Sequence, residues 1–272
     1  ADDTQAVVFM RLVDVLFRNN TVRTSGSTLG GGMSSVGCDL ELINVTFDSN
    51  ATSSVNQIAV GGGLLVLGGD NPNTVTLANV TFFGNSADIA AGFGQSQDTA
   101  APLSVTLSNV TFAGNTAAES GDHLFQDAGS THLRNVLFGP SVRTACNSTA
   151  APAITLLGGN MDTDGSCGVE FTTPDPGLAD GLAFDGGFTP TVALRADAAA
   201  IDAGTNDGCT ATDQRGAPRP FDGDGDEIAR CDIGAHERAA AAAVLQRLRG
   251  GAVGRISDAP PAKPRTHRCI NR

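Results

Sequence analysis

Apolar and polar residues alternate over short stretches of this chain, with an interruption at a fixed place. In the stretch TVTLANVTFFGN the apolar residues Val75, Leu77, Val80 and Phe82 first alternate with other residues and then skip one position at Asn79. A period of two residues is typical of a β-strand with one buried face. The pattern therefore predicts a strand, a bend at the asparagine and a second short strand.

The same pattern recurs along the first half of the chain. The clearest copies are LINVTFDSNAT at 42–52, LANVTFFGNSA at 77–87 and LSNVTFAGNTA at 107–117, with weaker copies at 13–22 and 133–142. Their aligned phenylalanines are Phe17, Phe47, Phe82, Phe112 and Phe138. A second, glycine-rich element lies between the copies, as in VGGGLLVLGG at 60–69. Each repeat of about thirty residues therefore contains at least two strands.

One repeat would form one turn, or coil, of a solenoid. A single coil cannot bury its own apolar face, but stacked coils pair their backbones with the coils above and below and join their small cores. Repeats rich in Val, Thr, Asn and Gly lack the residues that favour helices, which argues against a helical solenoid. The chain has no Trp and no Tyr, so the core must consist of aliphatic residues and Phe in thin layers. The predicted fold is all-β, a right-handed single-stranded parallel β-helix.

Asparagine occupies two repeat positions, which have two interpretations. One set contains Asn44, Asn79, Asn109 and Asn135, and the other contains Asn20, Asn50, Asn85 and Asn115. Asn tolerates left-handed backbone conformations, and its amide can bond the same residue one coil away, so ladders at coil bends are the favoured interpretation. The alternative is that N-V-T at 44–46, 79–81 and 109–111 forms glycosylation sequons.

The charge is uneven along the chain and limits the classes of partner. The formal net charge is −12, but residues 238–272 carry eight Lys and Arg against one acidic residue. An acidic body argues against a nucleic-acid partner, because its charge has the same sign as the phosphates. No apolar run reaches the length of a membrane span, and residues 1–10 lack a signal-peptide layout, so we expect any targeting signal upstream. The favoured interpretation of the basic tail is a flexible processed segment, and docking on the acidic body or on another subunit is the alternative.

Six cysteines without a tight CxxC pair favour disulfides over a structural zinc site. Two local pairings, Cys146 with Cys167 and Cys209 with Cys231, would staple the loop-rich second half and indicate an oxidising compartment. Sequence alone leaves the connectivity open. Cys269 is a candidate for an intermolecular disulfide, which would leave Cys38 unpaired.

From about residue 146 the period fades into turns rich in Gly, Pro and Asp. The strings FDGGFTPTVAL at 184–194, AIDAGTND at 200–207 and DQRGAPRPFDGDGDEIARCDIGAHE at 213–237 resemble the choice-of-anchor Q domain family. The resemblance implies a bacterial secreted or surface β-helix, with repeats similar to those of polymorphic outer membrane proteins. We expect regular coils over 1–145, terminal coils and a stapled acidic cap over 146–237, and a basic tail over 238–272.

A run of acidic residues is the strongest candidate for a metal site. Asp222, Asp224, Asp226 and Glu227 stand on or next to alternate positions separated by glycine, so their oxygens can converge on one hard cation such as calcium. The spacing does not complete an EF-hand loop, and a solvated acidic turn is the competing interpretation. Asp162 and Asp164 form a weaker second candidate. Pairing of Arg215, Arg219 and Arg230 with Asp213, Asp222 or Asp232 would compete with a metal.

Catalytic candidates are sparse. Asp122, His123, Asp127 and His132 form the one short span with both imidazole and carboxylate groups, and no carboxylate pair recurs on adjacent coils. The sequence therefore predicts a non-catalytic extracellular protein, a structural, adhesive or accessory subunit of a cell-surface assembly. Its partner would bind a β-helix face or the basic tail. A glycan ligand is left open, but the lack of Trp and Tyr disfavours a dedicated glycan cleft. The alternative is a polysaccharide lyase or glycoside hydrolase with its site on non-repeated loops.

Overall fold

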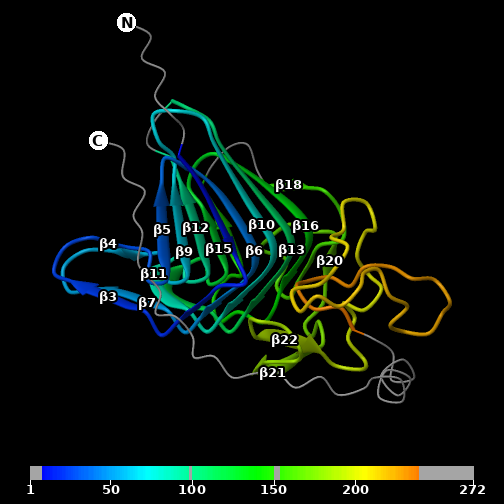
Figure 1. Ribbon diagram of the computed structural model, residues 1–272. Coiled ribbons are helices and arrows are strands. Elements are labelled where there is room, and N and C mark those ends of the chain that lie inside the picture. Colours follow the sequence, from blue (N-terminus) through cyan, green and yellow to red (C-terminus); the bar gives the residue numbers. More distant parts are fainter. Residues whose placement is uncertain (1–7, 98–99, 150–153, 239–272) are drawn as a thin grey trace, which may run out of the picture.

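The computed structural model describes residues 8–97, 100–149 and 154–238, and every regular element in these ranges is a β-strand. The strands stack as successive coils of a parallel β-solenoid (Figure 1). The predicted all-β, parallel β-helical fold is therefore confirmed. No helix in these ranges is long and apolar enough to cross a membrane.

The first of the three solenoid sheets contains the longest strands, one from each coil, and all of its pairs are parallel. Its order is β1 (Val8–Val13), β6 (Cys38–Asp48), β10 (Asn73–Phe83), β13 (Leu103–Ala113), β16 (Ser130–Phe138), β19 (Met161–Asp162) and β20 (Phe171–Thr172), with β2 (Leu16–Arg18) on β6 and β18 (Thr155–Leu156) on β16.

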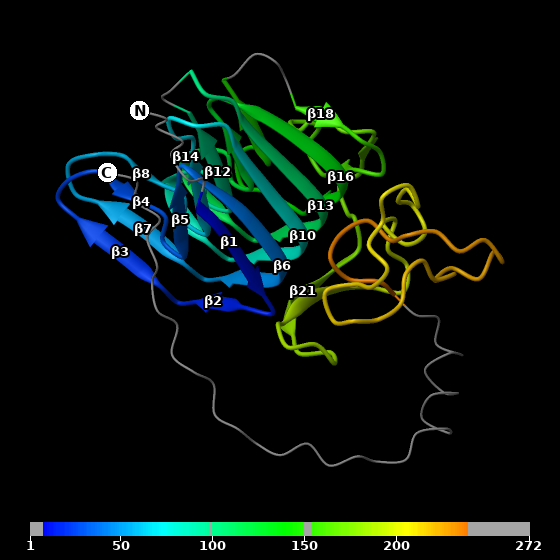
Figure 2. The ribbon, with the colours of Figure 1, turned by 45° about the horizontal axis from the view of Figure 1, so that its top comes forward.

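Two sheets of short strands complete each coil (Figure 2). The second sheet has the order β3 (Thr21–Thr24), β7 (Ala51–Ser54), β11 (Ser86–Ile89), β8 (Ala59–Val60) and β4 (Thr28–Leu29), with β14 (Thr116–Ser120) on β11. The third has the order β17 (Cys146–Ser148), β15 (Leu124–Gln126), β12 (Phe93–Ser96), β9 (Leu64–Leu67) and β5 (Met33–Val36).

The aligned phenylalanines form one column through the core. Phe47 pairs in register with Phe82, and Phe82 with Phe112. Successive rings from Phe17 to Phe138 lie 4.8–5.1 Å apart between centroids and within 8° of parallel. That spacing is close to the distance between adjacent strands, so the ring stack follows from the strand register.

The first asparagine set forms the bends of the long strands. Asn44, Asn79, Asn109 and Asn135 have φ between 50° and 55°. This left-handed conformation turns the chain, so that the following valine and phenylalanine join the core, whereas the threonine hydroxyl bonds residues outside the coil. Asn79 and Asn109 are 3% and 0% exposed, so in the folded chain they form bends and offer no surface for a glycan.

The second asparagine set forms a buried ladder. The side-chain amides of Asn20, Asn50 and Asn85 each donate to the Oδ1 atom of the asparagine in the next coil, at 2.8–2.9 Å. Neighbouring glycines allow this close stacking, since a Cβ atom at Gly62 would come within 2.5 Å of the Ala91 carbonyl oxygen.

The clamp, defined here as residues 177–238, lies outside the stacked coils (Figure 1). It begins with an antiparallel hairpin of β21 (Leu178–Ala183) and β22 (Thr191–Leu194) and continues as loops. Its apolar residues, such as Val192, Ile201 and Ile233, pack with Leu137 and Met161 of the first sheet in a second small core. The clamp therefore covers part of the outer face of the first sheet.

Candidate functional site

The clamp binds the outward-facing threonines of the coils through hydrogen bonds. Gln214 donates from Nε2 to Thr46 Oγ1 at 2.7 Å and accepts at Oε1 from Thr81 Oγ1 at 2.7 Å. The amide of Ala235 donates to Thr111 Oγ1 at 2.9 Å. These threonines are at most 1% exposed. The repeat N-V-T-F thus supplies polar contacts for the clamp as well as core residues.

The bend asparagines provide a second row of contacts to the clamp. Asn135 donates from Nδ2 to the Thr205 carbonyl oxygen at 2.9 Å and accepts from the Thr205 amide at 2.8 Å. The hydroxyl of Thr210 donates to Asn79 Oδ1 at 3.0 Å. Together the two rows hold the clamp against four successive coils.

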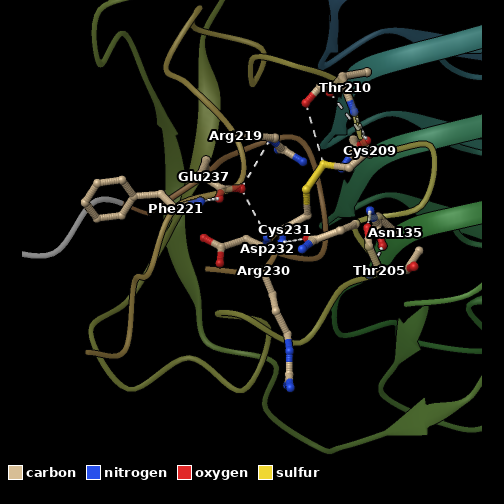
Figure 3. Close-up of a disulfide and its surroundings, with 12 residues drawn as sticks. Asn135, Thr205, Cys209, Thr210, Arg219, Phe221, Arg230, Cys231, Asp232 and Glu237 are labelled. Atoms are coloured by element: carbon tan, nitrogen blue, oxygen red, sulfur yellow. Dashed lines mark hydrogen bonds and ion pairs between the residues drawn. A yellow bond between two sulfur atoms is a disulfide. The ribbon is translucent and has the colours of Figure 1, made fainter. Parts of the chain in front are cut away.

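Both predicted local cysteine pairs are disulfides. Cys209–Cys231 lies inside the clamp (Figure 3), and Cys146–Cys167 joins β17 to a turn of the following coil. Cys38 belongs to neither pair and is buried, and its thiol donates to the Val36 carbonyl oxygen. Cys269 lies outside the described residues.

A buried network of charged groups lies beside Cys209–Cys231. Arg215 pairs with Asp213 at 2.7 Å, as predicted, whereas Arg219 pairs with Glu237 at 3.3 Å. The side chains of Arg219 and Glu237 are at most 2% exposed. Figure 3 shows that they lie side by side. The predicted partners Asp213, Asp222 and Asp232 were therefore wrong for Arg219. The chain folds back between residues 221 and 230 and so brings Glu237 to its guanidinium.

Burial and neighbouring charges shift the pKa values of the titratable groups in this network. Burial, together with the negative charge of Glu237, raises the pKa of Asp232 to about 8. Burial and the positive charge of Arg215 lower the pKa of His236 to about 3. Burial opposes ionisation of Asp213, but Arg215 and backbone amides outweigh it and lower the pKa of that carboxyl group. Burial in the network therefore favours the neutral forms of both Asp232 and His236.

The acidic run forms an exposed loop next to this network. Asp222 accepts from the amides of Gly225 and Glu227, Asp224 from the amide of Asp226, and Asp226 from the amide of Ile228. These are short-range turns in which carboxylates bond nearby amides. Part of the predicted metal-binding capacity is therefore used to shape the loop.

Asp222 and Asp224 converge with a third carboxylate that the sequence did not single out. Oxygen atoms of Asp202, Asp222 and Asp224 lie within 4.8 Å of one another. Asp202 is 5% exposed and accepts from the amides of Gly223 and Asp224 at 2.7 and 2.9 Å. The signal that could have revealed it is the isolated aspartate of AIDAG, which takes a positive φ of 51°.

The other predicted ligands do not join this group. Asp226 and Glu227 are exposed and lie outside the three converging carboxylates. Glu227 instead adopts a φ of 70° at the turn. The candidate cation site therefore consists of Asp202, Asp222 and Asp224, a set of hard oxygen ligands suited to calcium.

The weaker acidic candidate has a structural role. Asp162 is 0% exposed and accepts from the Cys167 amide and the Thr172 hydroxyl. Burial opposes ionisation of Asp164, but hydrogen bonds from Ser166, Ala145 and Ser141 lower its pKa. Both carboxylates therefore organise the turn that contains Cys146–Cys167.

The acid–imidazole span does not form a reactive centre. Asp122 is fully buried and accepts from the amides of Ala117, Val142 and Arg143. His123 ends the buried asparagine ladder. Its Nδ1 atom accepts from the side-chain amide of Asn115 at 3.2 Å, and its Nε2 atom donates to the Gly139 carbonyl oxygen at 2.9 Å. Burial lowers the pKa of His123, so the ring stays neutral.

The remaining two residues of this span lie elsewhere. Asp127 bonds the hydroxyls of Ser96 and Thr149 at the surface, and His132 lies in β16 opposite Thr106. A shared catalytic geometry of Asp122, His123, Asp127 and His132 is therefore absent from this described part of the chain.

The predicted basic tail lies outside the described residues except for Arg238, whose backbone amide donates to Asp232.

Comparison of the chain with known protein families, with curated proteins and with solved structures finds no match in any of the three. Fold and site geometry are therefore the basis on which function is proposed.

Proposed function

We propose that the chain is a non-catalytic extracellular protein, a structural, adhesive or accessory subunit of a cell-surface assembly. The observation that carries the proposal is the use of the repeated side chains. Phenylalanine fills the core column, asparagine forms bends and the buried ladder, and threonine binds the clamp. The coils thus repeat stacking groups and no pair of reactive groups.

The extracellular setting is supported by chemistry of the described residues. Two disulfides form and persist in oxidising compartments. The strings at 184–194, 200–207 and 213–237, which resemble the choice-of-anchor Q domain family, form much of the clamp. The same resemblance favours a bacterial secreted or surface protein.

The test is a comparison of turnover with complex formation. We expect no product release from a panel of neutral and acidic polysaccharides, and recovery of the native protein in a stoichiometric surface complex. Reproducible depolymerisation of any of these polysaccharides by the native protein would overturn the proposal in favour of a lyase or hydrolase.

We also propose that calcium binds at Asp202, Asp222 and Asp224. The converging oxygens support this assignment, and so does the link from Asp202 to the loop amides, because it orders the loop before a cation arrives. Exposed sites built from few carboxylates bind calcium weakly, with Kd of about 0.1–1 mM.

Calcium at several times Kd should raise the melting temperature by about 2–4 °C, and EDTA should reverse the shift. The variant Asp222→Asn with Asp224→Asn should lose the shift, whereas Asp226→Asn should keep it. A calcium response that survives the double variant, or the absence of any response in the native protein, would contradict the assignment.

A further inference from the structure

A shallow cleft of about 380 Å³ lies between the last coils and the clamp. One side comes from the coils and includes Glu170 and Phe171, and the other comes from the clamp and includes Thr205 and Arg230. None of the three carboxylates of the candidate cation site lines the cleft, although the two sites are adjacent. Its wall combines an aromatic ring, a guanidinium group and a carboxylate.

The polar groups of the cleft keep unused bonding capacity. The guanidinium of Arg230 points away from the buried network (Figure 3) and makes no ion pair or hydrogen bond with the described residues. Glu170 uses only Oε2, which accepts from the backbone and side-chain amides of Asn160 at 3.1 Å each. Its Oε1 atom remains available to a ligand hydroxyl.

The largest apolar side chain of the cleft is Phe171, one of the exposed phenylalanines outside the core column. Phe171 is 45% exposed, whereas the core phenylalanines Phe47, Phe82 and Phe112 are 0% exposed. An exposed ring that lines the same cleft as Glu170 and Arg230 presents a face on which a ligand with an apolar surface can lie.

The two sides of the cleft are held in place before any ligand arrives. Thr205 is bonded twice to Asn135, and the Gly204 amide donates to the Cys231 carbonyl oxygen at 2.8 Å. The backbone amide of Arg230 donates to Asp202 at 3.1 Å. A Cβ atom at Gly204 would come within 2.5 Å of the Cys231 carbonyl oxygen, so glycine permits this approach. Pre-organisation of this kind lowers the cost of binding.

We infer that this cleft binds the terminal residue of a neutral glycan. A pyranose has an apolar C–H face that fits Phe171 and vicinal hydroxyls that can accept from Arg230 and donate to Glu170. A neutral sugar also avoids repulsion from the acidic body, where the formal net charge of −12 disfavours acidic ligands. The biological setting, adhesion at a cell surface, rests on the proposed function, but the binding chemistry does not.

The experiment is calorimetric titration of the full chain with the methyl glycosides of glucose, galactose and mannose. We expect at least one to bind with Kd on the order of 1 mM, as is usual for a small ligand in an open cleft. Arg230→Ala, Glu170→Gln and Phe171→Ala should each weaken binding about tenfold, because each removes one of the three contacts.

Matched exposed residues outside the cleft provide the controls. Arg23→Ala, Glu119→Gln and Phe188→Ala should leave the affinity unchanged, and melting temperatures should show that all six variants fold. Failure of all three glycosides to bind, or equal losses in the cleft and control variants, would overturn the inference. Binding of acetate or glycine in preference to the glycosides would also overturn it.

Failure of this inference and failure of the proposed function give different results. A protein that binds a glycoside without cleaving a polysaccharide agrees with both. Polysaccharide cleavage contradicts the non-catalytic proposal even when the cleft binds sugar, whereas a stable surface complex without glycoside binding removes only the cleft assignment.

Discussion

The solenoid body and the clamp are stabilised by different kinds of contact. In the body each residue type meets its own copy in the next coil, as in the phenylalanine column and the buried asparagine ladder. In the clamp the contacts are between unlike groups, such as Gln214 with two threonines and Arg219 with Glu237. The body therefore distributes its stability over equivalent layers, whereas the clamp depends on individual polar residues.

The largest expected loss of stability comes from a substitution in the centre of the phenylalanine column. Phe82 is 0% exposed and stacks on Phe47 and Phe112, so Phe82→Ala removes contacts with both neighbouring coils. We expect a loss of about 3–5 kcal/mol in the free energy of unfolding, measured by urea denaturation. Phe188→Ala, at a position that is 83% exposed, is the control and should change it little. Equal effects of the two would show that the ring column is not central to stability.

A smaller effect separates the clamp from the body. Gln214→Ala leaves buried hydroxyls of Thr46 and Thr81 without these contacts, which should cost about 1–3 kcal/mol. Because the coils keep their own register, the loss should appear as faster hydrogen exchange and proteolysis within residues 177–238, with little change in the coils. Exposed Gln57→Ala is the control. An equal increase of hydrogen exchange in the clamp and in the coils would contradict the proposal that the two regions are stabilised separately.

The third expected effect is a pH dependence confined to the clamp. The folded state raises the pKa of Asp232 to about 8, so the folded clamp binds a proton that the unfolded chain releases near pH 4. Its contribution to stability is complete below that unfolded value and is lost as the pH rises through about 8.

His236 contributes with the opposite sign, because its folded pKa of about 3 lies below the unfolded value of about 6.5. Its contribution is complete above the unfolded pKa and is lost as the pH falls towards about 3. Above about pH 6.5 only the loss from Asp232 remains, so proteolysis of the clamp should increase towards pH 9. Asp232→Asn should flatten this rise, and an unchanged pH profile would count against the assignment.

The body could be predicted from the sequence because its information is local and repeated. The steps between Phe17, Phe47, Phe82, Phe112 and Phe138 gave the strand register directly, and Asn79 marked the bend. Local spacing also identified both disulfide pairs. In each case the residues that identify the contact also make it.

The clamp was less predictable because its contacts join residues far apart in sequence. Nothing near Thr46 indicates that Gln214 will cover it. Asp202 lies twenty residues before Asp222, and only the folded loops of the clamp bring their carboxylates together. The partner of Arg219 likewise proved to be Glu237 rather than a member of the acidic run.

The rows of clamp contacts have a consequence for how many coils the protein tolerates. Solenoids in general lengthen or shorten by whole repeats, because every layer accepts any neighbour of the same kind. Here Gln214, Ala235 and Thr205 meet Thr46, Thr111 and Asn135 at fixed intervals along the stack. A chain with one coil inserted between β6 and β16 would still stack its phenylalanines but would misalign the clamp by about 4.8 Å. The clamp therefore fixes the number of coils between β6 and β16.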